Sequence, residues 1–196
     1  MFIFAPVKSF AMKMTKNIWL VFGLLIIVGS IFRLLGFAPQ IAMAVFGAAV
    51  IKDKKLAFVL PLFSMLLSDI LYEVLYRFGY MPYGGFYEGQ VINYLLIIGV
   101  AFLGLWAANL KPARIITACL AAPCIYFVLS NFMLWLGNGG YQRPKTFSGL
   151  MMCYNDAVPF FRSSLQYTLL FSALLFGGYF FIQRFSLNRK SLISDL

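Results

Sequence analysis

The sequence contains no histidine and few charged residues. Only 11% of its 196 residues are charged and six are acidic, whereas about a quarter of an average soluble domain is charged. The absence of histidine removes the commonest metal ligand and the commonest general base near neutral pH. P-loop, Gly-x-Ser-x-Gly and His-Glu-x-x-His motifs are also absent. We therefore expect no enzyme, no metal and no cofactor. A small membrane enzyme that uses Asp69 or Glu73 is kept as an alternative.

Cysteine is also scarce, with three residues in the whole chain. Cys119 and Cys124 lie inside an apolar run, where they are typical of small buried hydrophobic side chains. Cys153 lies in a more polar segment, where inert packing and a reactive or metal-binding thiol are the two alternatives.

Hydrophobic residues, by contrast, make up 62% of the chain and gather in long runs. This composition predicts an integral membrane protein of one domain. Residues 37–51 are too short to cross a hydrocarbon core of roughly 30 Å, so this segment either thins the bilayer or is buried among its neighbours. We expect an all-α six-helix bundle over residues 17–183, between a basic N-terminus (1–16) and a basic tail (184–196). The six expected helices cover residues 18–32, 37–51, 56–77, 91–110, 114–137 and 159–181.

The net charge of +10 indicates orientation in a membrane rather than nucleic-acid binding. Six crossings send alternate loops to opposite sides. One side then receives eleven of the 16 Lys and Arg residues, and the other side receives five. The positive-inside rule therefore places both termini in the cytoplasm, and we expect a multi-pass protein of the bacterial inner membrane.

Residues 137–161 separate the last two apolar segments and differ from both. They combine polar side chains, a Gly-Gly pair and two prolines with an apolar face at helical spacing, formed by Phe147, Leu150, Met151 and Tyr154. We expect a structured cap with one short helix on the outer side of the bundle. We call residues 137–158 the cap.

The cap and the loops at 33–40 and 78–90 would all lie on the outer side. Tyrosines with a few polar groups favour a small-molecule site there, although an aromatic belt at the lipid headgroups is the alternative. The candidate binding residues are Asp69, Glu73, Tyr80, Tyr87, Asn131, Trp135, Tyr141, Tyr154 and Asn155.

Asp69 and Glu73 are four residues apart and therefore share one face of the third helix. A carboxylate at membrane depth is costly unless it faces the bundle interior or a wet cavity. Asp69 could form the floor of an outward-facing site and bind a proton or ligand. Alternatively, it forms a buried ion pair with Arg33 or Arg77 that fixes helix packing.

Two pairs of alanines have the small-xxx-small spacing that allows close helix approach. They are Ala44 with Ala48, and Ala118 with Ala122. Packing within the bundle and docking on a separate membrane partner are both consistent with this pattern.

Several short runs in the chain together resemble an uncharacterised family of small bacterial six-helix membrane proteins. They are residues 37–42, Leu60-Pro61-Leu62, Ser68-Asp69, Ser130-Asn131-Phe132 with Trp135, Gly149-Leu150, Cys153-Tyr154 and Pro159-Phe160-Phe161. That family in turn resembles the substrate-binding S components of energy-coupling-factor transporters, which import vitamins.

The resemblance implies a ligand held under the loops after helices one, three and five. It also implies a membrane coupling subunit, docked on an Ala-x-x-x-Ala motif, and separate ATPase subunits. That motif usually lies on the first helix, which lacks it here, so the two alanine pairs are the candidates. The expected function is a substrate-binding subunit of a vitamin-type importer. The alternative is a scaffold or assembly subunit whose outer loops contact another protein.

The orientation can be tested with reporter fusions placed after Tyr80 and after Lys111. We expect the first reporter to be periplasmic and the second cytoplasmic, because the two loops are separated by one helix. Activity of both reporters on the same side would contradict the six-helix topology.

Overall fold

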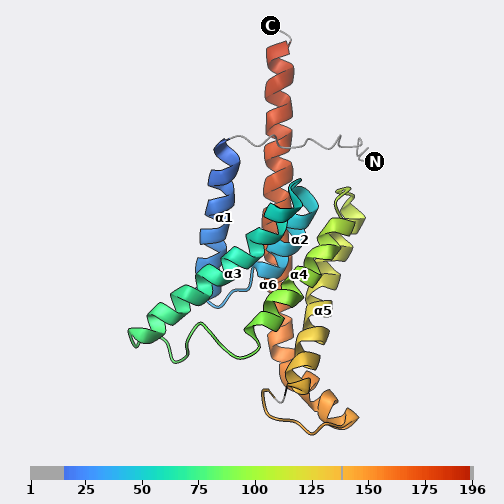
Figure 1. Cartoon of the computed structure of the whole chain (residues 1–196). Coiled ribbons are helices and arrows are strands. Elements are labelled where there is room, and N and C mark those ends of the chain that lie inside the picture. Colours follow the sequence, from blue (N-terminus) through green and yellow to red (C-terminus); the bar gives the residue numbers. More distant parts are fainter. Residues whose placement is uncertain (1–15, 138, 195–196) are drawn as a thin grey trace.

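The computed structural model describes residues 16–137 and 139–194, with side-chain surroundings for 20–137 and 139–184. This part of the chain forms six α-helices and no strand, as the sequence predicted (Figure 1). The N-terminal segment expected at 1–16 lies outside the described residues except for Lys16, and so does Asn138 of the cap. The helices are α1 (Lys16–Leu34), α2 (Gln40–Val50), α3 (Lys54–Arg77), α4 (Gln90–Trp106), α5 (Pro112–Leu136) and α6 (Phe147–Ser194).

Three of these helices are long and apolar enough to cross a membrane. They correspond to Lys54–Arg77, Pro112–Leu136 and Phe147–Arg184. The other apolar stretches, counted over residues with described side-chain surroundings, are Leu20–Leu34, Gln40–Val50 and Gln90–Trp106, with 10–17 residues each. Length and composition therefore support three crossings rather than the six that the sequence predicted.

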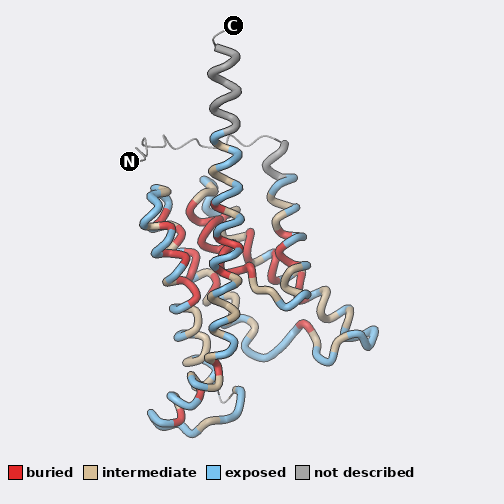
Figure 2. Tube along the Cα trace, turned by 180° about the vertical axis from the view of Figure 1, so that it is seen from behind, coloured by how far each residue is buried: buried red, intermediate tan, exposed pale blue. Residues whose placement is uncertain are grey.

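Helix α2 forms the centre of the bundle. It packs against α3, α4, α5 and α6, and its residues Gln40 through Ala49 are all buried. Figure 2 shows this buried region at the middle of the molecule. The sequence predicted that this segment either thins a bilayer or is buried among its neighbours, and the structure shows the second.

The four alanines of the small-xxx-small pairs all lie in this interior. Ala44 and Ala48 of α2 and Ala118 and Ala122 of α5 have exposures of 0%. Their small side chains therefore serve packing within the chain, which was one of the two alternatives. None of them is on a surface that a separate subunit could reach without opening the bundle.

The connection between α2 and α3 is fixed by two charged side chains. The Asp53 carboxylate accepts hydrogen bonds from the backbone N–H groups of Lys55 and Leu56, at 3.0 and 3.4 Å, and thereby caps α3. Lys54 Nζ donates to the carbonyl oxygens of Ala48 and Ile51, both at 3.0 Å, at the carboxyl end of α2. Both helix ends thus gain partners for backbone groups that would otherwise have none.

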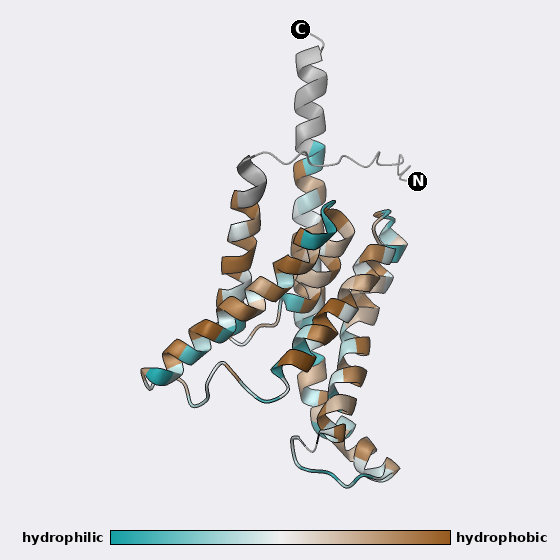
Figure 3. Ribbon diagram, viewed as in Figure 1, coloured by the Kyte–Doolittle hydropathy of each residue, from teal (hydrophilic) through white to brown (hydrophobic). Residues whose placement is uncertain are grey.

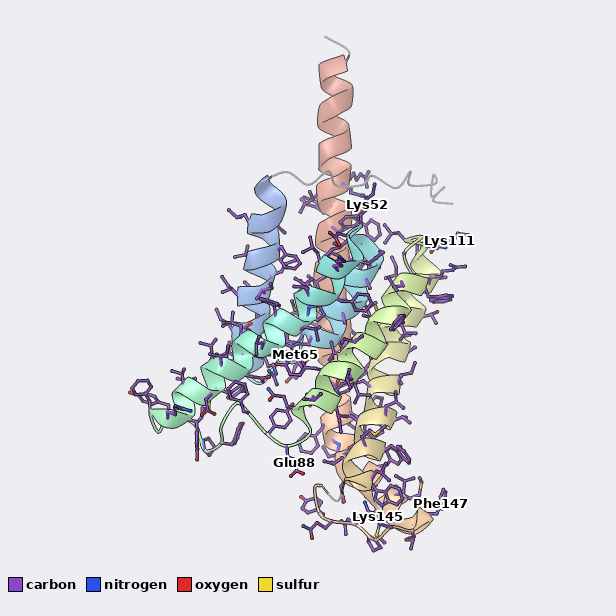
Figure 4. The ribbon with its side chains drawn as sticks, in the orientation of Figure 1. Lys52, Met65, Glu88, Lys111, Lys145 and Phe147 are labelled. Atoms are coloured by element: carbon purple, nitrogen blue, oxygen red, sulfur yellow. The ribbon has the colours of Figure 1, made fainter. Side chains whose placement is uncertain are left out.

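The loops of the chain lie at two opposite ends of the bundle. Lys52 and Lys111 lie at one end, whereas Glu88, Lys145 and Phe147 lie at the other (Figure 4). This arrangement agrees with the predicted alternation of loops. We call the end with Glu88 and the cap the cap end.

The short cap helix expected from the sequence is not a separate element. Residues 147–158 form the first turns of α6, which continues through Pro159. Proline removes one backbone hydrogen bond from a helix interior and usually bends the helix rather than starting a new one. Figure 1 shows the first turns of α6 running in a different direction from the rest. The boundary placed at Pro159 was therefore wrong.

Hydrophobic residues predominate along the helices (Figure 3). Large hydrophobic side chains are exposed on every helix except α2. Examples are Leu20 and Leu24 of α1, Phe63 of α3, Leu95 and Phe102 of α4, Ile116 of α5, and Leu170 and Leu174 of α6.

The crossing of α2 and α4 depends on Gly104, because a Cβ there would overlap the carbonyl oxygen of Val45. We expect Gly104→Ala to lower the free energy of unfolding by about 1–3 kcal/mol through overpacking. Gly99→Ala, on the same helix, meets no atom within 4 Å. It should be neutral or stabilise by up to about 1 kcal/mol, since alanine is the better helix former. Unfolding of the purified variants in detergent measures both, and equal effects would contradict the close crossing.

Candidate functional site

The Asp69 carboxylate is buried where α1, α3 and α4 meet. Its exposure is 1%, and one oxygen forms an ion pair with Arg33 of α1. The other oxygen accepts hydrogen bonds from Gln90 Nε2 and from the Tyr94 hydroxyl of α4, both at 2.6 Å. Both carboxylate oxygens are therefore occupied by protein groups, as a buried charge requires.

The Arg33 guanidinium has further partners on α3. It donates to the carbonyl oxygen of Met65 at 3.1 Å and to the Ser68 hydroxyl at 2.5 Å. The Tyr72 hydroxyl in turn donates to the backbone carbonyl of Arg33 at 3.0 Å. Of the two alternatives for Asp69, this geometry favours the ion pair that fixes helix packing. Arg77 pairs with Glu73 instead, at 2.9 Å.

The loop between α3 and α4 is held against α3 by two glycines. Gly85 is buried, and a Cβ there would overlap the carbonyl oxygen of Asp69. Its backbone N–H donates to Glu73 Oε2 at 3.2 Å. A Cβ on Gly84 would also approach Glu73, at 2.7 Å. The absence of side chains at both positions lets the loop lie directly on the helix.

A groove of about 460 Å³ opens at the cap end between α4 and α5. Its lining combines the loop after α3, the facing sides of both helices, and the loop after α5. The lining residues are Tyr87, Glu88, Gly89, Ile92, Asn93, Leu96, Tyr126, Ser130, Met133, Leu134, Gly137, Gly139 and Gly140. We call this the α4–α5 groove.

Hydrogen-bonded polar side chains line this groove in a row. Asn93 Nδ2 donates to the Tyr87 hydroxyl at 2.6 Å, and the Tyr126 hydroxyl donates to Asn93 Oδ1. Ser130 Oγ, one turn from Tyr126, donates to the carbonyl oxygen of Phe127 at 3.3 Å. The groove therefore has polar groups held in fixed positions beside apolar walls, which is the usual character of a small-molecule site.

The cap is ordered by its own contacts. Arg143 donates two hydrogen bonds to the Asp156 carboxylate, at 2.8 and 3.0 Å, and these raise the pKa of the Arg143 guanidinium above its usual value. Trp135 Nε1 donates to the carbonyl oxygen of Pro144 at 2.9 Å, and Lys145 Nζ lies 4.9 Å from the Trp135 ring centroid. A shallower hollow of about 450 Å³ lies on the cap, lined by Arg143, Ser148, Met151, Met152, Asn155 and Asp156.

Residues 13–190 match a family of unknown function, DUF6580. The chain belongs to this family. No curated protein and no solved structure matches it. This agrees with the expected membership of an uncharacterised six-helix family, and the match itself provides no link to the vitamin importers.

The nine binding residues predicted for this DUF6580 chain fall in five places. Asp69 belongs to the α1–α3–α4 contact, Glu73 pairs with Arg77 and holds Gly85, and only Tyr87 lines the α4–α5 groove. The others lie in or against the cap, except Tyr80, which is exposed in the loop after α3. The structure therefore does not bring the nine together.

The residues of the cap group mostly hold the cap in place. Tyr154 donates to the carbonyl oxygen of Val128 at 2.9 Å. Asn131 Nδ2 donates to the carbonyl oxygen of Phe127 at 2.8 Å, and its own carbonyl oxygen lies 3.7 Å from Cys153 Sγ. Tyr141 is exposed and lies beside Arg143, whereas Asn155 lines the cap hollow.

Sequence reasoning missed most of the polar groove residues. Asn93 is a polar residue near the start of an apolar helix, and Ser130 follows Tyr126 by four residues. The second spacing places two polar groups on one helix face, which was the available signal. Among the described residues, no group of three or more His, Cys, Asp or Glu side chains is arranged to hold a metal.

We expect Asp69→Asn to lower the free energy of unfolding by about 3–5 kcal/mol, because it leaves the Arg33 charge, which is only 19% exposed, without its partner. Arg77→Gln is the matched control. Its ion pair with Glu73 is at the surface, with the Arg77 side chain 76% exposed, so the cost should stay below about 1 kcal/mol. Denaturant titration in mixed micelles measures both. Similar losses for the two variants would contradict a structural role for the buried pair.

Proposed function

We propose that this chain is a membrane-embedded subunit that binds a small molecule at its outer face for uptake, with the α4–α5 groove as the ligand site. One observation carries the proposal. The groove is lined jointly by Tyr87 to Gly89, from the loop after α3, and by Gly137, Gly139 and Gly140, from the loop after α5. These are two of the three loops under which the sequence resemblance places a ligand.

Membrane insertion is supported by the surface of the bundle. Apolar side chains cover the outward faces of the helices, and three helices have the length and composition of a membrane span. Contiguous apolar surface on this scale is typical of contact with lipid. The basic end with Lys52 and Lys111 would face the bacterial cytoplasm, and the cap end would face outward.

Transport also requires a source of energy, which this chain does not contain in any recognisable motif. By its resemblance to S components, we propose that a membrane coupling subunit and separate ATPase subunits supply it. The four alanines of the expected docking motif are buried, so the coupling subunit would dock on another part of the bundle.

The alternative function, a scaffold that contacts another protein, is favoured by the exposed aromatic side chains at the cap end. Tyr141 has an exposure of 78%, and Phe147 and Phe160 each have 77%. Exposed aromatic groups of this size are common at protein interfaces. They are, however, equally suited to the headgroup region of a membrane.

Native mass spectrometry of the gently purified protein tests the proposal. We expect a small molecule to be retained by the natural protein and by Ser148→Trp, which fills the cap hollow. Ser130→Trp should lose it, because the indole would occupy the α4–α5 groove. Retention by Ser130→Trp but not by Ser148→Trp would move the site to the cap. A stoichiometric protein partner without any small molecule would favour the scaffold.

A further inference from the structure

The α4–α5 groove has a charge that is unusual for this chain. Lys and Arg outnumber Asp and Glu by 16 to six in the sequence, yet the groove lining contains no Lys or Arg and one acidic residue, Glu88. The cap hollow, in contrast, contains the neutralised pair of Arg143 and Asp156.

Glu88 also differs from the other acidic side chains that the structure describes. Asp69, Glu73 and Asp156 each pair with an arginine, and Asp53 caps α3. Within the described residues, Glu88 forms no ion pair. Glu88 directly precedes Gly89, the N-cap of α4, but it does not cap that helix with a side-chain hydrogen bond. The groove therefore presents the one described carboxylate that neither pairs with an arginine nor caps a helix.

The row of polar side chains in the groove offers more hydrogen-bond acceptors than donors, which suits the same kind of ligand as the Glu88 carboxylate. Tyr126 and Ser130 use their hydroxyl protons within the protein, on Asn93 and on the Phe127 carbonyl. Their oxygen lone pairs are left to face a ligand. Acceptor positions therefore exceed donor positions in this row, although Tyr87 keeps its own hydroxyl proton and Asn93 Nδ2 keeps its second proton.

The remainder of the lining suits an apolar or aromatic body. Ile92, Leu96, Met133 and Leu134 form the walls, and the Tyr87 and Tyr126 rings add π faces. Aromatic faces attract organic cations as well as apolar groups. A volume of about 460 Å³ is within the range of sites for small molecules.

We infer that the α4–α5 groove selects a small organic cation, in which an ammonium group attached to an apolar or aromatic body lies toward Glu88 and the acceptor row. This inference rests on the proposed function, because it takes the groove to be the ligand site. The same ammonium chemistry is carried by free amines and by the headgroup of phosphatidylethanolamine.

Three indole compounds of similar size separate charge from shape: tryptamine is a cation, tryptophol is neutral and indole-3-propionate is an anion. We expect the full chain in maltoside micelles to bind tryptamine most tightly in equilibrium dialysis. Glu88→Gln should weaken tryptamine binding about two- to fivefold, the range for an ion pair near the surface, and leave tryptophol binding unchanged.

Asp53→Asn is the matched control. It removes the same charge at the opposite end of α3, and asparagine caps a helix about as well as aspartate. Binding of all three compounds should therefore be unchanged. Tryptophol or indole-3-propionate binding as tightly as tryptamine would overturn the inference. So would equal tryptamine affinity of Glu88→Gln and the natural protein, or no tryptamine binding at all.

The two proposals fail in different ways. If Ser130→Trp abolishes binding of tryptophol or indole-3-propionate while tryptamine has no advantage, the groove is a ligand site and only the charge selection is wrong. Repeating the tryptamine measurement in phosphatidylglycerol nanodiscs, with and without phosphatidylethanolamine, identifies the source. If phosphatidylethanolamine weakens tryptamine binding by competition, a lipid headgroup is the natural cation. If tryptamine binds equally well with and without this lipid, the natural cation is a free amine.

Discussion

The ion pair between Arg33 and the buried Asp69 is the contact on which the junction of α1, α3 and α4 depends. It joins α1 to α3, and the second Asp69 oxygen joins α3 to the first turns of α4 through Gln90 and Tyr94. The loop that connects α3 to α4 is thereby fixed near its far end by Gln90, and Gly85 holds its middle against α3. Tyr87 to Gly89 lie between these two fixed points, Gly85 and Gln90. The position of one wall of the α4–α5 groove therefore depends on the Arg33–Asp69 pair, which does not itself line the groove.

Helix α2 is held by small residues along its length and by a charged side chain at its carboxyl end. Its alanines permit close contact with neighbouring helices inside the bundle. The Lys54 ammonium satisfies its terminal carbonyl oxygens outside the interior. A helix too short to cross a bilayer is thus stabilised by contacts on all sides rather than by lipid.

Helix number and approximate bounds could be predicted because the apolar runs are long and are separated by charges, glycine or proline. The break expected at Pro159 was wrong because proline is tolerated within a helix whose neighbours hold both halves, here through contacts such as Phe127 with Phe161. The Asp69–Arg33 pair was among the alternatives, since a deep carboxylate needs a cation.

The groove could not be predicted from sequence in the same way. Tyr87, Asn93 and Tyr126 come from a loop and two helices, and only the packing of α4 on α5 brings them together. The binding residues were predicted from local composition. Composition shows where polar and aromatic side chains are frequent, but not which of them already have hydrogen-bond partners within the protein. Trp135 and Tyr154, for example, use their polar atoms on backbone carbonyls of Pro144 and Val128.

The continuity of α6 has a mechanical consequence. One helix runs without interruption from Phe147 in the cap, through Asp156 of the Arg143–Asp156 pair, to the opposite end of the bundle. Any displacement of the cap must therefore either bend α6 at Pro159, where a backbone hydrogen bond is missing, or move the rest of α6 together with the cap. Helix α6 therefore couples the cap mechanically to the opposite end of the bundle, and Pro159 is the position where this helix bends most easily.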